Sequence, residues 1–483
     1  MPADDTAERG IGDAIDAAAE TYGLTLTDEE RDAYRTEIEN TEALLSSLTA
    51  TAFESTPAED VTEGTDEYNA FLYRCTLAGA DSGSLAGRDV AVKDNIAVAG
   101  VPMTCGSGAI DFEPSYHAAV TNRLLESGAN LAGTTNMDEF AYFTTSETCA
   151  HGPVTNPNAE GVPGGSSSGS GAAVAAGLVD AALGTDTGGS IRIPASFCGI
   201  VGFKPTFRTV PRFGFADLAS SLDHIGPLAP DVEAAATVLE AINGPDSRDP
   251  STDGVPTPAP TDGLGRDADG LRVGLVEEAQ GRADDEVADA IEHATDRLEA
   301  AGVTVEAVSL PGFNTQPLVN AAVTAAEFTT LAAQAGQDIG VGTGYSEGWR
   351  EAMATMDADE LGENVRARLV IGRALAAGDD SAGYVAAQNT RQQFRDTVDE
   401  RLDSYDALVL PTTPITAPEY GSVETDADLL ETIACTSPFN LTGHPALSVP
   451  CGEAGDPVGC QFVTDWFDEA TAVALGRALE SSS

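Results

Sequence analysis

Serine is the residue type whose setting in this chain most clearly permits covalent chemistry. Ser190 follows Gly188 and Gly189, where a strand predicted over Ala181–Thr187 must turn sharply. Such a glycine turn lets consecutive backbone N–H groups converge on a negatively charged oxygen, as acyl transfer requires. A serine hydroxyl is a weak nucleophile and needs a base. The sequence therefore predicts Ser190 as a nucleophile and requires a base near it.

Lysine is almost absent from the chain, which makes its two lysines candidates for that base. Lys93 and Lys204 are the only lysines among 24 Lys and Arg residues. A buried lysine can lose its proton near neutral pH, whereas a guanidinium stays charged. Lys93 lies in DVAVKDNI, an alternation typical of a half-buried strand, and Lys204 lies in GFKPT. The residues alone leave the choice open, and both lysines could instead be structural.

Several long motifs resemble the amidase signature family of serine hydrolases, from about Asp89 to the C-terminus. The motifs are VAVKDNI, TNMDEF, GGSSSGS, ALGTDTGGSIRIPASFCGIVGFKPT, SLDHIGPLA, LVLPTTP, NLTGHPALSVPCG and GCQF…FDEAT. The resemblance implies a Ser–cis-Ser–Lys triad, with Ser190 as nucleophile, Ser166 as the bridging serine and Lys93 as base. It therefore favours Lys93 over Lys204. No cofactor and no metal ion are expected, because the triad and backbone donors supply the acyl-transfer chemistry.

The same resemblance implies a supporting shell around the triad. The backbone N–H groups of Thr187, Gly188, Gly189 and Ser190 are expected to hold the oxyanion, and one such donor is worth about 3–4 kcal/mol in other enzymes. Three side chains are expected to support the turn without reacting: Ser167, Asp186 and Arg192.

Two functions fit these motifs. The first is a free-standing amidase that converts a small carboxylic acid amide to carboxylate and ammonia. The second is the A subunit of glutamyl-tRNA(Gln)/aspartyl-tRNA(Asn) amidotransferase, which takes ammonia from glutamine and works with other subunits. That protein carries an acidic residue seven positions before the Asn of NLTGHP, where this chain has Ile433. This departure and the Asp223-His224 pair favour the amidase. An inactive scaffold is disfavoured because all three triad positions are retained.

The composition is strongly acidic, with 78 Asp and Glu against 24 Lys and Arg and a formal net charge of −54. Acid spread along the whole length with scarce lysine is typical of a halophile's cytoplasmic protein. No basic stripe is present, so direct nucleic-acid binding is not expected. The seven cysteines lack a CxxC pair and predict reduced, buried thiols. Neither a signal peptide nor an apolar run of about 18 residues is found, so a soluble cytoplasmic protein without a membrane partner is expected.

The order of predicted elements favours an α/β protein with one large domain, in which helices cover both faces of a central mixed sheet. Helical spacing and a capping box predict a helical hairpin over residues 1–50, followed by a linker over 51–68. The catalytic domain is expected over 69–483. Within it, residues 243–270 are rich in Pro, Gly and Asp and predict an exposed insertion.

Three further expectations concern the substrate and the assembly. Residues 311–380 match the family least and are expected to wall the acyl pocket, where Arg366 and Arg368 could bind a substrate carboxylate. The N-terminal hairpin leaves a homodimer open. The five histidines are scattered, so a Ser-His-Asp triad with Ser190 is the weaker alternative.

Overall fold

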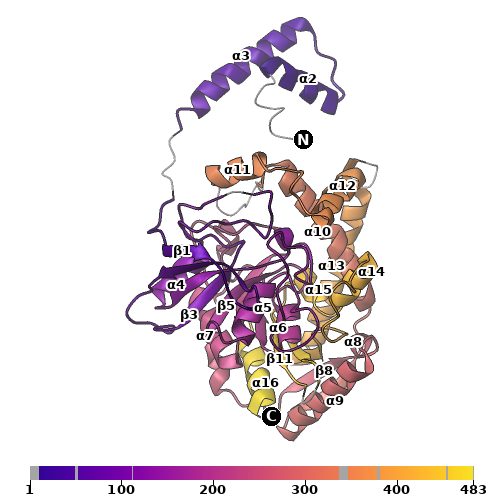
Figure 1. Ribbon diagram of the computed structural model, residues 1–483. Helices are drawn as coiled ribbons and strands as arrows, with labels where there is room; N and C mark the ends of the chain where they lie inside the picture. The colour runs from indigo at the N-terminus through magenta and orange to yellow at the C-terminus, as the bar shows by residue number, and fades with distance from the viewer. Residues whose placement is uncertain are drawn as a thin grey trace.

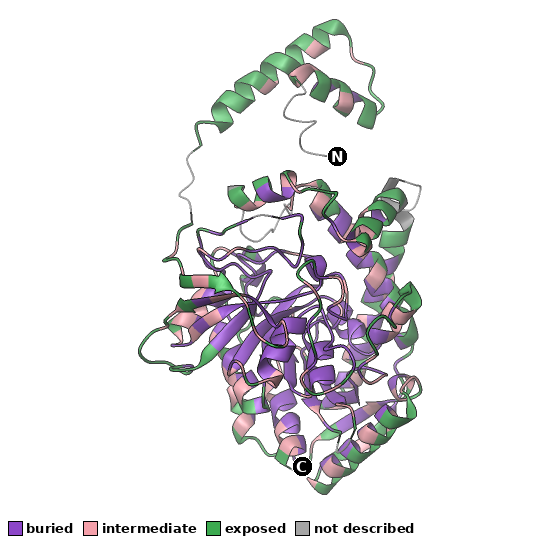
Figure 2. Ribbon diagram, in the orientation of Figure 1, coloured by how far each residue is buried: buried purple, intermediate pink, exposed green. Residues whose placement is uncertain are grey.

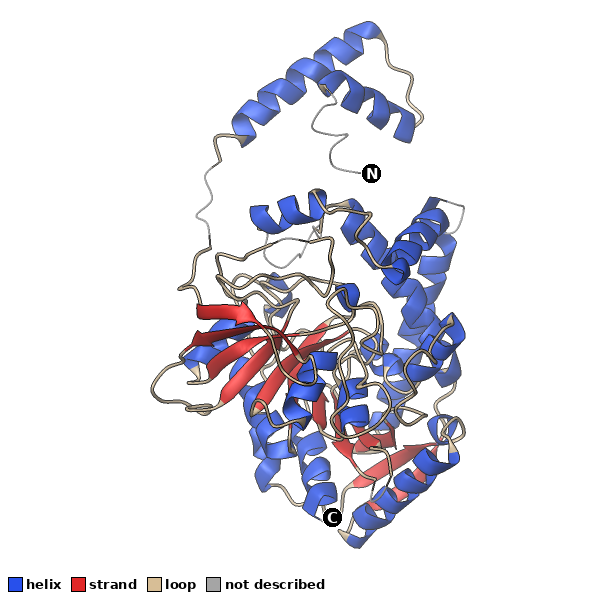
Figure 3. Ribbon diagram, viewed as in Figure 1, coloured by secondary structure: helices blue, strands red, loops and turns tan. Residues whose placement is uncertain are grey.

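A mixed sheet of twelve strands carries the candidate residues in this computed structural model (Figures 1 and 3). The structure describes residues 10–48, 53–110, 112–336, 346–377, 381–452 and 455–481. Across the sheet the strands follow the order β1-β2-β4-β3-β5-β7-β6-β11-β12-β10-β8-β9. The predicted α/β architecture is confirmed.

The strands are short and most of the central ones are fully buried. Their bounds are β1 (Glu59–Glu63), β2 (Phe71–Leu77), β3 (Asp89–Lys93), β4 (Asn130–Thr135), β5 (Ala181–Asp186), β6 (Val201–Lys204), β7 (His224–Ala229), β8 (Arg272–Val276), β9 (Thr304–Val308), β10 (Ala407–Pro411), β11 (Ala446–Pro450) and β12 (Gly459–Thr464). β3 is parallel to β4 and β5, whereas β7 runs antiparallel to β5 and β6.

Helices cover both faces of this sheet, as predicted. The α-helices are α2 (Ile11–Thr21), α3 (Asp28–Leu45), α4 (Ala119–Glu126), α5 (Ser168–Ala175), α6 (Arg192–Cys198), α7 (Val232–Ile242), α8 (Glu277–Gln280), α9 (Asp285–Ala300), α10 (Gln316–Ala333), α11 (Glu347–Ala354), α12 (Glu363–Ala377), α13 (Ser381–Leu402), α14 (Asp426–Thr432), α15 (Ser437–Thr442) and α16 (Glu469–Ser481). Short 3₁₀ turns are η1 (Glu139–Ala141), η2 (Pro250–Thr252), η3 (Pro260–Gly265) and η4 (Phe313–Thr315). Helices α4, α7 and α16 pack on one face, while α5, α6 and α15 pack on the other.

The alternation in β3 explains where its lysine points. Val90 and Val92 join the larger hydrophobic core beneath α4 and α7, whereas Ala91 joins the smaller core beneath α5 and α6. Successive side chains of a strand point to opposite faces, so Lys93 lies on the α5 side, two positions after Ala91. The strand thereby delivers the amine to the loop that precedes α5.

The N-terminal hairpin is built as predicted and lies away from the sheet (Figures 1 and 2). Thr27 and Glu30 form the expected capping box at the start of α3, and Gly23 has the positive φ of +63° expected after α2. Helix α3 buries none of its residues. Nothing in the described chain therefore requires this hairpin for the integrity of the sheet.

Two expected boundaries are wrong in detail. The linker predicted over 51–68 contains β1, which pairs with β2 at the sheet edge; its polar sequence EDVTE lacks the apolar alternation that marks a strand. The insertion predicted over 243–270 is not wholly exposed, because Asp249 is buried and η3 packs against α16 and α7. Buried Asp249 accepts a hydrogen bond from the Arg212 backbone, which ties this segment to the domain.

The described part of residues 311–380 includes the α-helices α10, α11 and α12. Residues 337–345 and 378–380 lie outside the described chain. No helix of the described residues is long and apolar enough to cross a membrane. All seven cysteines are buried and unbridged, in agreement with the predicted thiols.

Candidate active site

Lys93 and Ser166 meet in the interior of the protein. Lys93 Nζ lies 2.7 Å from Ser166 Oγ and 2.8 Å from Thr185 Oγ1, and neither Lys93 nor Ser166 has any exposed surface. Burial lowers the pKa of Lys93 to about 7, although the carboxylates of Asp138 and Asp186 partly oppose that shift. A substantial fraction of this amine is therefore neutral near pH 7 and able to accept a proton.

The loop before α5 presents Ser166 to the lysine. The Gly165–Ser166 peptide bond is cis, as the resemblance implies, and the Ser166 carbonyl accepts a hydrogen bond from the Asp138 N–H at 3.2 Å. A Cβ at Gly165 would lie 2.0 Å from Asp138 Oδ2, so this approach requires glycine. Ser167 Oγ donates to the Thr185 carbonyl and accepts from the Thr185 N–H, which fixes the loop to β5.

Ser190 lies in the turn between β5 and α6, as predicted, with 6% of its surface exposed. The carbonyl oxygens of residues 186–189 all accept hydrogen bonds from fixed neighbours. The donors, in chain order of the acceptors, are Asn440 Nδ2 (3.0 Å), Asn320 Nδ2 (3.0 Å), Thr436 Oγ1 (2.6 Å) and the Ile193 N–H (2.7 Å). A trans peptide points its N–H opposite to its C=O, so each N–H of residues 187–190 points away from the donor that holds the carbonyl of the same peptide.

A buried ion pair supports the turn from behind. Arg192 contacts both carboxylate oxygens of Asp186, at 2.9 and 3.0 Å, and both side chains are fully buried. Burial alone would raise the pKa of Asp186, but the Arg192 guanidinium outweighs it and holds that pKa well below its usual range. Arg192 also donates to the Thr436 carbonyl and to Gln461. Asp186 therefore stays ionised near neutral pH, and the pair orients the turn.

Two further side chains hold the turn and were not predicted as site residues. Asp223 Oδ1 accepts a hydrogen bond from Thr187 Oγ1 at 2.5 Å, and Asn320 donates to the Thr187 carbonyl. Asp223 Oδ2 accepts the N–H groups of Leu218 and Ala219. Burial raises the pKa of Asp223 to about 6. These contacts join residues 36 and 133 positions apart in sequence, so the residues around Ser190 do not reveal them.

Lys204 lies elsewhere in the interior and does not join the triad candidates. Its Nζ donates to the carbonyls of His444 (2.6 Å) and Pro205 (3.0 Å) and lies 3.3 Å from His224 Nε2. Burial lowers its pKa well below the usual range. Among the hydrogen bonds of the described histidines, none reaches Ser190. The geometry thus favours Lys93 as base over either Lys204 or a histidine.

A cavity of about 100 Å³ opens beside Ser190 and is mostly apolar. Its lining comprises Ala141, Tyr142, Phe143, Thr144, Thr187, Gly188, Ser190, Leu218, Asn320, Ala321, Thr324, Ala325, Arg368, Ile371, Leu429, Leu430 and Ile433. Arg368 alone is charged among these described lining residues. It forms an ion pair with Asp426 and lies 5.7 Å from the Tyr142 ring. Arg366 is exposed and does not line the cavity, so only one of the two predicted arginines reaches the site.

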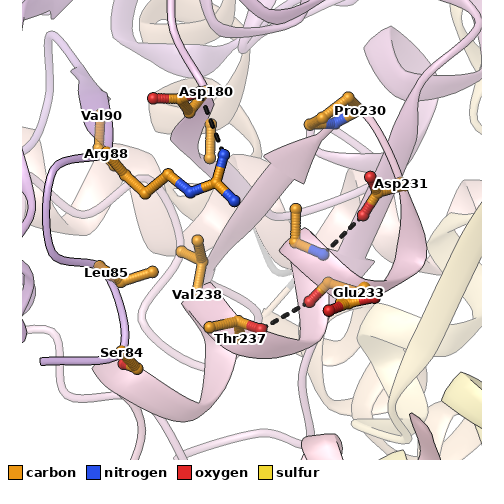
Figure 4. A pocket seen from close by; sticks show the side chains of 12 residues that line it. Ser84, Leu85, Arg88, Val90, Asp180, Pro230, Asp231, Glu233, Thr237 and Val238 are labelled. Carbon is orange, nitrogen blue, oxygen red and sulfur yellow. Dashed lines mark hydrogen bonds and ion pairs between the residues drawn. The ribbon is translucent and has the colours of Figure 1, made fainter.

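A second cavity, of about 240 Å³, lies where β3 and β5 begin, whereas Lys93 lies where β3 ends (Figure 4). Arg88 there pairs with Asp180, and Asp231 caps α7 by accepting the Ala234 N–H. Local structure thus accounts for its charged groups. In the described ranges, no group of three His, Cys, Asp or Glu side chains is placed to hold a metal ion.

The chain is similar over most of its length to known proteins. The amidase family model matches residues 14–473. The A subunit of glutamyl-tRNA(Gln) amidotransferase from Natronomonas pharaonis is 45% identical over 420 residues, covering 85% of this chain and 99% of that protein. The crystal structure of its counterpart from Thermotoga maritima shares 33% identity with a TM-score of 0.74, covering 88% of this chain and 87% of its own. The structure of 6-aminohexanoate cyclic dimer hydrolase shares 26% identity with a TM-score of 0.73, covering 83% and 85%. This chain belongs to the amidase signature family.

Proposed function

We propose that this chain hydrolyses a primary carboxamide through an acyl-enzyme on Ser190. Neutral Lys93 accepts a proton from Ser166, Ser166 accepts one from Ser190, and the Ser190 oxygen attacks the amide carbon. The proton returns through Ser166 to the leaving nitrogen, which departs as ammonia. Water then cleaves the ester by the same relay. The 2.7 Å contact between buried Lys93 and Ser166 is the observation that carries this mechanism.

The turn supplies electrostatic stabilisation in this mechanism. The N–H groups of Thr187, Gly188, Gly189 and Ser190 bind the oxygen that becomes negative when the tetrahedral intermediate forms. The side chains that donate to the carbonyls of this turn, together with the buried Asp186–Arg192 pair, hold the N–H donors in place before substrate binds. Preorganised donors need little rearrangement during the reaction, which is why such a turn lowers the barrier.

Glutamine is the substrate that we infer, with the chain serving as the A subunit of an aminoacyl-tRNA amidotransferase. Arg368 at the wall of a mostly apolar cavity suits a carboxylate, and its partner Asp426, which lies outside the cavity lining, suits an ammonium group. Glutamine carries both groups and a primary amide. The amidotransferase subunits matched at 42–45% identity support the same substrate, and other subunits would then receive the ammonia. These relatives favour this role over the free-standing amidase preferred from the sequence.

A free-standing amidase remains the second candidate because of the apolar part of the cavity wall. Leu429, Leu430 and Ile433 line that wall, and no carboxylate lines the cavity in the described chain. A wholly apolar acyl group would fit this surface. The charge of Arg368 would then be balanced by its ion pair with Asp426.

Ammonia release by the purified protein in molar KCl separates the two candidates. We expect glutamine to be cleaved, and Arg368→Gln to raise KM for glutamine about tenfold while kcat and the cleavage of a neutral aliphatic amide stay unchanged. Arg366→Gln is the matched control, because this arginine lies on the same helix and is exposed. Rapid cleavage of neutral amides, with glutamine refused even when partner subunits and tRNA are added, would instead establish the free-standing amidase.

A further inference from the structure

Asp138 and Glu139, where η1 begins, connect the proposed triad to α12, the helix that carries Arg368. The Asp138 N–H donates to the Ser166 carbonyl at 3.2 Å. The next residue, Glu139, accepts the Gly362 N–H at 2.9 Å on one carboxylate oxygen and at 3.2 Å on the other. Gly362 directly precedes α12. Two consecutive residues therefore contact the loop that carries Ser166 and the start of α12.

Glu139 is placed to hold α12 tightly. Its side chain is 1% exposed, and its Oε1 also accepts the Ser107 hydroxyl at 2.6 Å. A Cβ at Gly362 would lie 2.5 Å from Glu139 Oε2, so an alanine there would require the carboxylate to shift. A carboxylate at a helix N-terminus is favourable because it accepts an otherwise unpaired N–H and faces the positive end of the helix dipole.

The helix that Glu139 holds forms one wall of the cavity beside Ser190. Arg368 and Ile371 of α12 line the cavity, and Asn364 donates to the Tyr142 carbonyl at 2.8 Å, which adds a second tie between the same two segments. The first turns of α12 thus have little freedom to slide along η1. We infer that Glu139 is a positioning residue that holds α12 so that Arg368 reaches the substrate carboxylate, an inference that rests on the proposed function.

The Glu139 carboxylate is buried without a cation beside it in the described chain. Glu139 forms no ion pair among the described residues, and burial raises its pKa. Burying a carboxylate without a cation is costly unless hydrogen bonds replace its water. At Glu139 the Gly362 N–H and the Ser107 hydroxyl take the place of that water. Because Gly362 directly precedes α12, the contact couples the charge of Glu139 to the position of that helix.

Glu139→Gln tests the inference through substrate specificity. We expect KM for glutamine to rise about tenfold, while kcat and the cleavage of a neutral aliphatic amide stay within about twofold of wild type. Gly362→Ala perturbs the same contact from the other side and should give the same change if Glu139→Gln folds poorly. The double variant Glu139→Gln, Arg368→Gln should be no worse than Arg368→Gln alone, since both changes remove one function. Glu147→Gln is the matched control, because Glu147 also binds a glycine N–H, that of Gly421.

Hydrogen exchange gives a readout that does not depend on the substrate. Amides of residues 362–371 should exchange faster in Glu139→Gln than in wild type and in the control, while amides of β3 and β5 stay unchanged. Equal loss of activity on both substrates, additive effects in the double variant, or unchanged exchange over 362–371 would each overturn the inference. If wild-type protein refuses glutamine but cleaves neutral amides, the proposed substrate fails, and exchange alone then decides whether Glu139 holds α12.

Discussion

Lys93 owes its proposed role to burial. The amine has no exposed surface, and its pKa of about 7 follows from the loss of water around the charged form. An arginine at this position would stay charged and could not accept a proton. The scarcity of lysine in the sequence identified Lys93 as a candidate, and the family motif chose it over Lys204. Only the folded chain, however, reveals that the Lys204 amine donates hydrogen bonds to two carbonyl groups.

The pH dependence of kcat/KM should report this lysine. A lowered pKa means that the neutral, active amine predominates above about pH 7, so kcat/KM should rise through about pH 7 and level off above about pH 8. Initial rates of ammonia release between about pH 5.5 and 9 measure the profile, and Lys93→Arg should abolish turnover. A flat profile, with chemistry shown to be rate-limiting, would remove Lys93 from the role of base.

Asp223 should affect turnover more than binding. Asp223→Asn weakens the 2.5 Å hydrogen bond from Thr187, whose N–H is a proposed oxyanion donor. We expect kcat to fall about tenfold to a hundredfold with KM changed less than about threefold. Asp231→Asn is the control, because Asp231 caps α7 far from Ser190. An increase in KM with kcat unchanged would show that Asp223 shapes the pocket and not the oxyanion turn.

Elements that carry their own periodicity were predictable from the sequence. The strand of Lys93 was found because its apolar alternation and its burial agree. Strand β1 was missed because its polar residues show no apolar alternation. It forms through backbone pairing with β2 and not through side-chain packing. The sequence offered both Arg366 and Arg368 as carboxylate ligands and could not choose between them. The position of α12, which decides that only Arg368 lines the cavity, depends on the long-range contact between Gly362 and Glu139.

The N-terminal hairpin should be dispensable for the chemistry. Helix α3 buries no residue, and all twelve strands of the sheet lie outside the hairpin. A variant that begins at Phe53 should therefore retain kcat for amide hydrolysis within about twofold, because the contacts of Lys93, Ser166 and Ser190 lie in the domain. Steady-state ammonia release and a thermal melt of both proteins make the comparison. A large loss of kcat with an unchanged melting temperature would assign the hairpin a part in the site.

At the scale of the whole molecule, the net charge of −54 dominates behaviour in solution. Like charges repel in the compact state, and salt screens them, with a Debye length of about 10 Å at 0.1 M and about 3 Å at 1 M. The relatives found in salt-loving archaea, such as Natronomonas pharaonis, agree with this composition. Charge was readable from the sequence, whereas the gathering of distant residues at Ser190 was not, because it depends on how distant segments pack around the sheet.

Thermal stability should accordingly rise with salt. We expect the Tm to increase by several degrees between about 0.1 M and 2 M KCl, since screening reduces self-repulsion in the folded state. Differential scanning calorimetry at fixed pH measures the shift, with sucrose of equal osmolality as the uncharged control. A Tm that is independent of KCl, or that rises equally in sucrose, would contradict the electrostatic explanation.

The most direct test of the central claim is ammonia release together with trapping of the acyl group by hydroxylamine. Wild-type protein in molar KCl, given glutamine or a simple primary amide, should release ammonia and transfer the acyl group to hydroxylamine as a hydroxamate. Ser190→Ala, with an unchanged thermal melt, should do neither. Ammonia release that persists in Ser190→Ala, or wild-type turnover that never yields a hydroxamate, would contradict an acyl-enzyme on Ser190.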